Sequence, residues 1–425
     1  MRILFLCNYY PPQHFGGYEE LCQDVALGLR ERGHQVTVLT SRPRPSHGSG
    51  DTVATGSAGE GPEVIRALET EVAIGDPRAT SRLILCRAGR ATRNRRRLAA
   101  VLAQTQPDVA VTWGLWNLAP DVAANLETAL DQRVLYYVAD DWPTLPQAIV
   151  QHLHAPTSNR FAAFAKSALA HGLPQSTKLL TSGLLLSHVA CVSQAVLNNL
   201  TAAGVVMGEA EVIHNGIHPE RFKLPTPPAP SPPPLRLILI GRLTAEKGCL
   251  VALEALTQAC AAGHDLSLSL VGGVAEDMKA RLNHAIDAAG LSERVQLLGH
   301  QPGLAIPGIL AGHHVLIVPS QGTDALPRSA QEGMAAGLAV IASRLGGLPE
   351  LIDDGHTGLL VPPGDAAALA QAIGRLAADP ALRQRLAAAG RQRIEGEFDI
   401  RRTVQRVESR LLHMLDSPLA GQPRK

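Results

Sequence analysis

Two cationic side chains stand close together at the end of a predicted strand, in the segment Gly241-Arg242-Leu243-Thr244-Ala245-Glu246-Lys247-Gly248. The planar guanidinium of Arg242 can donate to two phosphate oxygens at once, and the ammonium of Lys247 is a compact charge. A helix that begins directly after them would add backbone N–H groups and the positive end of its dipole. The pattern predicts a diphosphate site that needs no metal ion. The alternative is a strand-end turn with solvated charges.

Two carboxylates eight residues apart form a second candidate site. Asp324 precedes a predicted helix that begins at Arg328, and Glu332 lies within that helix. Ionised carboxylates accept hydrogen bonds from hydroxyl groups, so this pair suits a sugar and a ribose. The alternative is an aspartate near a helix N-terminus followed by a solvated charge, which is a common combination.

Signatures of several other ligand sites are missing from the sequence. The loop after the first predicted strand lacks Gly-x-Gly-x-x-Gly, which disfavours a dinucleotide cofactor, and no Gly-x-x-x-x-Gly-Lys-Ser/Thr occurs. No Asp-x-Asp is present to hold a metal-bound diphosphate, and the cysteines form no Cys-x-x-Cys pair. We therefore expect neither a bound metal ion nor a resident cofactor.

The elements that must position these residues follow a strand-helix rhythm. Apolar residues 3–6, a loop with Gly16-Gly17, a helical pattern over 18–32 and a strand pattern over 36–38 predict a first strand-helix-strand unit. Further strands are predicted in the first half at 109–113, 134–139, 188–192 and 211–214. In the second half they are predicted at 237–240, 266–271, 295–298, 315–318 and 339–342. The fold class is therefore α/β, with two doubly wound Rossmann-like domains.

A proline-rich segment separates the two halves. Seven of the twelve residues in 223–234 are proline, which favours a stiff, extended connector. We predict a first domain over 1–222, a linker over 223–234 and a second domain over 235–398, with a helix near 400–420 that packs back on the first domain. Two such domains would place the carboxyl ends of both sheets across one cleft. Segment 42–62, rich in Gly, Pro, Ser and Thr, predicts an irregular excursion.

Composition limits the classes of function. Of 425 residues, 45% are hydrophobic and 18% charged, which is typical of globular domains and unlike a disordered chain. The formal charge of +1 gives no overall field that would attract nucleic acid. We find no signal peptide and no run of about 18 apolar residues, and the cysteines are scattered, so we expect a reducing, cytoplasmic setting.

Several short motifs follow one another along nearly the whole chain: Gly16-Gly17, Cys191-Val192-Ser193, Ile213-His214-Asn215-Gly216-Ile217, Gly241-Arg242-Leu243, Glu246-Lys247-Gly248, Val271-Gly272-Gly273, Pro319-Ser320, and the two acids followed by Met334-Ala335-Ala336-Gly337. Each motif is weak alone. The ordered set resembles the retaining glycosyltransferases of family 4, also described as group 1 glycosyl transferases, of GT-B architecture. The resemblance implies two Rossmann-like domains that face each other across a cleft.

The resemblance also implies roles for individual residues. Arg242 and Lys247 would hold the diphosphate of a nucleotide sugar, Glu332 the ribose and Asp324 a hydroxyl of the transferred sugar. Gly16 and Gly17 would lie near the donor phosphate and the acceptor. The remaining donor-site residues would be Gly272, Ala325 and Leu326.

Two departures from the family pattern concern the reaction centre. Asp324 stands where the family usually has Glu, and its shorter side chain bears on the identity of the donor. The family often has a His at the end of a first-domain strand, whereas this chain reads Tyr136-Tyr137-Val138-Ala139-Asp140-Asp141-Trp142. Asp140 or Asp141 orients a substrate there, or the two residues only end the strand.

The implied activity is that of a hexosyl- or other glycosyltransferase in polysaccharide or glycolipid biosynthesis. It would move a sugar from a UDP-, GDP- or ADP-sugar to a glycan, a lipid-linked or a small-molecule acceptor, with retention of configuration and without a metal. The rivals are a sugar-nucleotide epimerase, a phosphorylase, and a non-catalytic relative that binds nucleotide sugars.

Two further features leave alternatives open. His14, in the glycine loop, contacts the substrate or is an exposed histidine without a role. The second feature is a basic cluster that contacts anionic lipid at the inner face of the membrane or forms a solvated helix face. Its members are Arg87, Arg90, Arg93, Arg95, Arg96 and Arg97.

Overall fold

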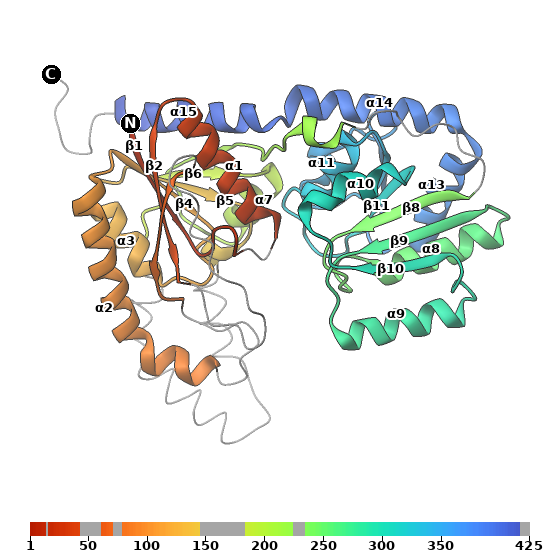
Figure 1. Ribbon diagram of the computed structural model, residues 1–425, viewed down its shortest axis with the longest axis horizontal. Helices are drawn as coiled ribbons and strands as arrows, with labels where there is room; N and C mark the ends of the chain where they lie inside the picture. Colours follow the sequence, from red (N-terminus) through yellow and green to blue (C-terminus); the bar gives the residue numbers. More distant parts are fainter. Residues whose placement is uncertain (14–15, 43–60, 71–78, 145–182, 224–233, 417–425) are drawn as a thin grey trace. The chain divides into compact units, whose positions relative to one another are not determined.

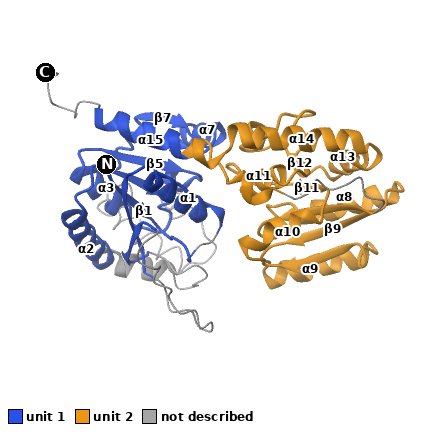
Figure 2. Ribbon diagram, turned by 45° about the horizontal axis from the view of Figure 1, so that its top comes forward, with its two compact units in different colours: residues 1–213, 404–425 blue, residues 214–403 orange. Residues whose placement is uncertain are grey.

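The computed structural model describes residues 1–13, 16–42, 61–70, 79–144, 183–223 and 234–416, with backbone only for 79–88. The chain forms two compact units, which Figure 2 shows in different colours. Unit 1 contains Met1–Ile213 and Val404–Lys425, and unit 2 contains His214–Thr403. His14 and the segments 43–60 and 224–233 lie outside the described residues.

Unit 1 contains a parallel sheet in the order β3-β2-β1-β4-β5-β6-β7. Its strands are β1 Arg2–Cys7, β2 Gln35–Ser41, β3 Glu63–Leu68, β4 Val109–Trp113, β5 Val134–Val138, β6 His188–Cys191 and β7 Glu209–Val212. Its helices are α1 Gly17–Glu31, α2 Ala79–Thr105, α3 Pro120–Ala129, α7 Gln194–Ala202 and most of α15 Ile400–Asp416. Figure 1 shows α1 on one face of the sheet and α2 and α3 on the other. Because helices cover both faces, β1 after Arg2 and the whole of β4 are buried at successive positions rather than at alternate ones.

Unit 2 contains a parallel sheet in the order β10-β9-β8-β11-β12-β13. Its strands are β8 Leu235–Ile240, β9 Leu266–Val271, β10 Val295–Gly299, β11 Val315–Val318, β12 Ala339–Ser343 and β13 Leu359–Val361. Its helices are α8 Cys249–Ala261, α9 Glu276–Ala288, α10 Ile306–Ala311, α11 Arg328–Ala335, α12 Leu348–Leu351, α13 Ala366–Ala378 and α14 Pro380–Glu397. Leucine, isoleucine and alanine side chains from β8, β9, α8 and α13 form its core.

The strand orders determine where ligands can bind. Each sheet runs outward in one direction from its first strand and then reverses, between β1 and β4 in unit 1 and between β8 and β11 in unit 2. Open α/β sheets bind ligands at such a reversal, beyond the carboxyl ends of the strands. The loops after β8 and β11 carry Lys247 and Asp324, and the loops after β1 and β5 carry Gly16 and Asp140. The prediction of two parallel α/β domains is confirmed.

The units divide at 213/214, nine residues before the predicted end of the first domain at 222. The segment after β7 belongs to unit 2 because its backbone is bonded there. Ile217 N–H donates to Phe398 O over 2.9 Å, and Ile400 N–H donates to Ile217 O over 2.8 Å. Proline content indicates a stiff connector, whereas backbone hydrogen bonds decide which unit a segment joins.

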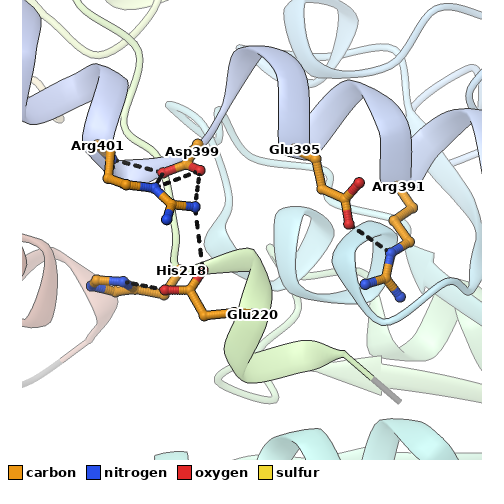
Figure 3. A network of polar contacts seen from close by, with 6 residues as sticks. All are labelled: His218, Glu220, Arg391, Glu395, Asp399 and Arg401. Atoms are coloured by element: carbon orange, nitrogen blue, oxygen red, sulfur yellow. Dashed lines mark hydrogen bonds and ion pairs between the residues drawn. The ribbon is translucent and has the colours of Figure 1, made fainter. Parts of the chain in front are cut away.

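Polar side chains add to this attachment (Figure 3). Arg401 pairs with Asp399 and, over 3.6 Å, with Glu220, which also contacts His218 Nδ1 over 3.2 Å. The guanidinium of Arg401 is exposed, so the pairs themselves stabilise the unit little. They mark residues 218–220 as part of unit 2.

Candidate functional site

Lys247 is held at the carboxyl end of β8 by a tight turn. Its backbone N–H donates to Thr244 O over 3.2 Å. Gly248 follows with φ 72°, and a Cβ there would lie 1.9 Å from Pro319 O, in the loop after β11. The two loops at the reversal of the sheet therefore touch, and only glycine fits at their contact. The turn leads directly into α8, whose N-terminal end carries partial positive charge.

Asp324 lies in the loop between β11 and α11. Its backbone oxygen accepts a hydrogen bond from Gly347 N–H over 2.9 Å. Its carboxylate accepts a second bond from Ser320 Oγ, which lies 2.8 Å from Oδ2. Ser320 is fully buried, so both the backbone and the side chain of Asp324 are positioned from within the unit.

The structure brings Lys247 and Asp324 together. Lys247 Nζ lies 2.7 Å from Oδ1 and 2.6 Å from Oδ2 of Asp324. The side chains are 29% and 15% exposed, so the pair is partly shielded from water. The sequence predicted each residue in the site, but it did not predict their contact. In this state the ammonium assigned to phosphate is neutralised by the carboxylate assigned to the sugar.

Arg242 lies in the same loop as Lys247, before the turn, and has a different environment. Its side chain is exposed and has no salt-bridge partner within the described residues. Glu332 is half-buried on α11. The carboxyl ends of β8 and β11 thus present one exposed guanidinium and one paired ammonium, an arrangement that can bind a polyanion.

The other predicted donor-site residues shape the loops. Gly272, at φ 144°, leaves no room for a Cβ, which would lie 1.7 Å from Gly241 O. Leu326 is buried, and its carbonyl accepts a long hydrogen bond from Asn215 Nδ2, 3.4 Å away. Ala325 lies between Asp324 and Leu326 in the same loop. The backbone of these residues, rather than their side chains, defines the surface beside Asp324.

In unit 1, Gly16 and Gly17 begin α1. Gly16 N–H donates to Glu19 Oε2 over 3.2 Å, which satisfies one free N–H of the helix N-terminus. Tyr18 Oη donates to Tyr137 O at the end of β5, and Trp113 stacks on the Tyr137 ring at 4.1 Å. The start of α1 is thereby fixed against the ends of β4 and β5.

Asp140 follows β5 directly and is mostly shielded from water. Burial raises the pKa of its carboxyl to about 6; the hydrogen bond from Trp142 N–H opposes that shift, and the charges of Asp141 and Glu19 add to it. Trp142 N lies 3.1 Å from Asp140 Oδ1, the geometry of a local turn. The structure is therefore consistent with both roles considered for Asp140. Its hydrogen bond ends the strand, and its raised pKa is typical of groups that contact a substrate.

Sequence reasoning did not assign functional roles to Ser320 and Glu19. Ser320 belongs to the motif Pro319-Ser320, and a hydroxyl four residues before a candidate carboxylate is a signal that could have identified it. Glu19, in the first turn of α1, matches the preference for acidic residues at helix N-termini. Its proximity to Asp140 depends on the tertiary fold.

The basic cluster on α2 is partly neutralised. Glu69 pairs with Arg93 over 2.7 Å and with Arg97 over 2.8 Å, and these hydrogen bonds lower the pKa of its carboxyl to about 2. Arg95 and Arg96 are exposed. No helix in the described part of the chain is long and apolar enough to cross a bilayer. Among the described residues, no three His, Cys, Asp or Glu side chains are grouped to hold a metal ion.

Two family descriptions match the chain, one for each half. Residues 15–221 match Glycosyltransferase Family 4, and residues 224–393 match Glycosyl transferases group 1. Glycogen synthase of Mycobacterium tuberculosis is 28% identical over 413 residues, which is 94% of this chain and 91% of that protein. The amylovoran biosynthesis glycosyltransferase AmsK of Erwinia amylovora is 33% identical over 213 residues, 49% of this chain. That match spans about half of AmsK, 52% of its length.

Solved structures share the fold over almost the whole chain. Anabaena HepE in complex with UDP-glucose has a TM-score of 0.65 and 21% sequence identity, and the match covers 97% of this chain and 100% of HepE.

Proposed function

Because this chain belongs to the family 4 and group 1 glycosyltransferases, we propose that it transfers a sugar from a nucleoside diphosphate sugar to an acceptor hydroxyl, with retention and without a metal ion. The observation that carries the proposal is the pairing of Lys247 with Asp324 beside the exposed Arg242, at the reversal point of the unit 2 sheet. Cations suited to a diphosphate and a carboxylate suited to sugar hydroxyls meet there.

On the donor side, Arg242 and Lys247 bind the diphosphate, and Asp324 accepts a hydrogen bond from a hydroxyl of the sugar. Glu332 accepts from the hydroxyls of the ribose. The backbone around Gly272, Ala325 and Leu326 forms the surface against the nucleotide sugar. The N-terminal end of α8, directly after Lys247, adds partial positive charge.

In the reaction, the bond between the anomeric carbon and the diphosphate oxygen breaks, and a bond from that carbon to the acceptor oxygen forms. Negative charge grows on the leaving diphosphate, so fixed cations bind the transition state more tightly than the ground state. The leaving phosphate oxygen takes the acceptor's proton on the face where the new bond forms. This route retains the configuration and requires no nucleophile from the protein.

On the acceptor side, unit 1 provides the start of α1 at Gly16 and Gly17, and Asp140. A carboxylate with a pKa near 6 is mostly ionised at neutral pH and can orient an acceptor hydroxyl by accepting its hydrogen bond. Asp140 is therefore assigned to the acceptor, in the place where the family often has His.

The relatives suggest which substrates to test first. HepE was solved with UDP-glucose, and AmsK is named for the biosynthesis of amylovoran. UDP-sugars are therefore the first donors to test, before GDP- and ADP-sugars, and glycans the first acceptors, before lipid-linked and small-molecule ones. We place the reaction in the cytoplasm, and we propose contact with anionic lipid at the inner face of the membrane as the route to a lipid-linked acceptor.

The test is a donor screen followed by turnover. The purified chain is melted with each nucleotide sugar, because a bound ligand stabilises the protein by RT ln(1 + [L]/Kd). Release of nucleoside diphosphate is then measured with each acceptor. Stabilisation by one nucleotide class and acceptor-dependent release support the proposal. Donor turnover without acceptor indicates an epimerase. A requirement for inorganic phosphate indicates a phosphorylase, and binding without turnover indicates a non-catalytic relative.

A further inference from the structure

The contact between Lys247 and Asp324 occupies the cation that the diphosphate needs. An ammonium has three N–H donors, and two of them point at the two oxygens of Asp324, 2.7 and 2.6 Å away. While the pair is intact, one N–H of Lys247 remains for a phosphate oxygen. The carboxylate also cancels most of the charge that would attract the diphosphate.

Contacts within unit 2 hold the backbone of Lys247 and both the backbone and the carboxylate of Asp324. Lys247 is fixed by the turn to Thr244 and by the contact of Gly248 with Pro319. Asp324 is fixed by Gly347 N–H on its backbone and by the buried Ser320 hydroxyl on Oδ2. Neither partner needs a large backbone movement to meet the other.

From this geometry we propose that Asp324 competes with the diphosphate for Lys247, and that Ser320 is the positioning residue that holds Asp324 in the competing place. The inference rests on the proposed function, because it takes Lys247 as a diphosphate ligand. This competition would let the site distinguish the intact nucleotide sugar from the nucleoside diphosphate product.

The distinction follows from what each ligand offers Asp324. A nucleotide sugar that takes Lys247 can return a hydroxyl hydrogen bond to the displaced carboxylate. A free nucleoside diphosphate keeps its ribose but lacks the transferable sugar, so it leaves a mostly buried carboxylate with Ser320 as its described donor. Leaving such a group under-satisfied is unfavourable. The protein therefore binds the product more weakly than its cations alone would allow, and the return of Asp324 to Lys247 promotes product release after transfer.

Four proteins test this competition: wild type, Asp324→Asn, Ser320→Ala and Glu246→Gln. Asp324→Asn keeps the size of the side chain and removes its charge. Ser320→Ala removes only the hydroxyl that positions the carboxylate. Glu246 is exposed, is adjacent to Lys247 in sequence and has no ion pair among the described residues, so Glu246→Gln controls for the loss of one nearby negative charge. Isothermal titration with UDP, GDP and ADP, and with the matching nucleotide sugars, gives both affinities for each protein.

We expect Asp324→Asn to bind the free nucleoside diphosphate more tightly, by roughly three- to tenfold, because a partly shielded ion pair no longer opposes it. The same variant should bind the nucleotide sugar more weakly. Ser320→Ala should shift both affinities in the same directions by a smaller factor, and Glu246→Gln should change the diphosphate affinity less than about twofold, as expected for a screened surface charge.

The outcomes separate the two levels of the proposal. If the wild type binds none of the diphosphates or nucleotide sugars, the proposed function fails. The competition is wrong while the function stands if the wild type binds these ligands and Asp324→Asn lowers the affinity for the free nucleoside diphosphate. The same conclusion follows if Asp324→Asn raises that affinity no more than Glu246→Gln does. Ser320→Ala keeps the test decisive if Asp324→Asn folds poorly, because an unchanged ratio of the two affinities in that variant contradicts the role of Ser320. Melting temperatures of all four proteins verify the fold.

Discussion

Replacing Asp140 by Asn should make the protein more stable at neutral pH. The carboxyl of Asp140 is held in a place that disfavours its charge, since burial raises its pKa from 3.8 to about 6. The Asn side chain keeps an oxygen that can accept the hydrogen bond from Trp142 N–H, 3.1 Å from Oδ1. The substitution therefore removes the charge and leaves the strand-end turn intact.

The magnitude follows from the size of the pKa shift. It is about two units, and each unit corresponds to about 1.4 kcal/mol, which gives an upper limit of about 3 kcal/mol. Partial access of water reduces this, so we expect a gain of about 1–3 kcal/mol at pH 8. Because the folded-state pKa lies above the unfolded one, the cost of ionised Asp140 is absent below pH 4 and grows as pH rises through 6. The gain from Asp140→Asn should thus vanish between pH 6 and pH 4.

Urea unfolding of wild type and Asp140→Asn at pH 8, 6 and 4 measures this dependence. Asp141→Asn is the comparison variant: its side chain is exposed next to the same turn, and its effect should be smaller because burial, rather than the charge of Asp141, is the main cause of the raised pKa of Asp140. A gain that is absent at pH 8, or equally large at pH 4, would refute the reasoning. Transfer activity separates the two roles of Asp140: a large fall in kcat/KM for Asp140→Asn supports contact with the acceptor, whereas unchanged activity leaves only the strand-end role.

Three other predictions concern unit 2. Arg242→Ala and Lys247→Ala should each lower kcat/KM by roughly 30- to 1000-fold, mainly through kcat, because each removes a fixed cation from the leaving diphosphate, and Arg242→Lys should recover part of the loss. Steady-state transfer assays measure this, and kcat within about twofold of wild type in a folded variant would contradict it. Glu332→Ala should lower the affinity for the free nucleotide by about 10- to 150-fold in a titration, because its carboxylate binds the ribose. An unchanged affinity would mean that Glu332 is only a solvated charge on the helix. Gly272→Ala should cost about 2–4 kcal/mol of stability in urea unfolding, since its Cβ would meet a backbone oxygen at 1.7 Å, whereas Gly273→Ala has open space and is its control.

Much of the fold was predictable because buried parallel strands leave a direct signal. Val315–Val318, a continuous apolar run, and Leu266–Val271, in which leucine and serine alternate, have the predicted bounds, and α11 begins at Arg328 as expected after a proline. β3, Glu63–Leu68, was not predicted, because it is a half-buried edge strand with charged residues. The division of the two units at 213/214 differs from the predicted boundary at 222 and depends on the backbone bonds of Ile217, which no local pattern shows.

The roles predicted for the candidate-site residues stay predictions, and the contact between Lys247 and Asp324 was not predicted. Charged residues beside glycines at strand ends predicted Lys247 and Asp324 individually. Their contact joins residues 77 positions apart through two irregular loops, where sequence spacing carries no geometry. The pKa of Asp140 depends on burial and on Glu19 from another element, so the sequence alone left its role open.

Proton NMR of the reaction mixture in excess EDTA tests the proposed activity most directly. The anomeric signals of donor and product report bond transfer and configuration together, and the chelator removes divalent metal ions from the same sample. Our proposal predicts that donor is consumed only with acceptor present, that the new glycoside has the anomeric configuration of the donor, and that the rate is unchanged by the chelator. An inverted product, or activity that disappears with EDTA and returns with magnesium or manganese, would contradict the retaining, metal-free transfer proposed for this chain.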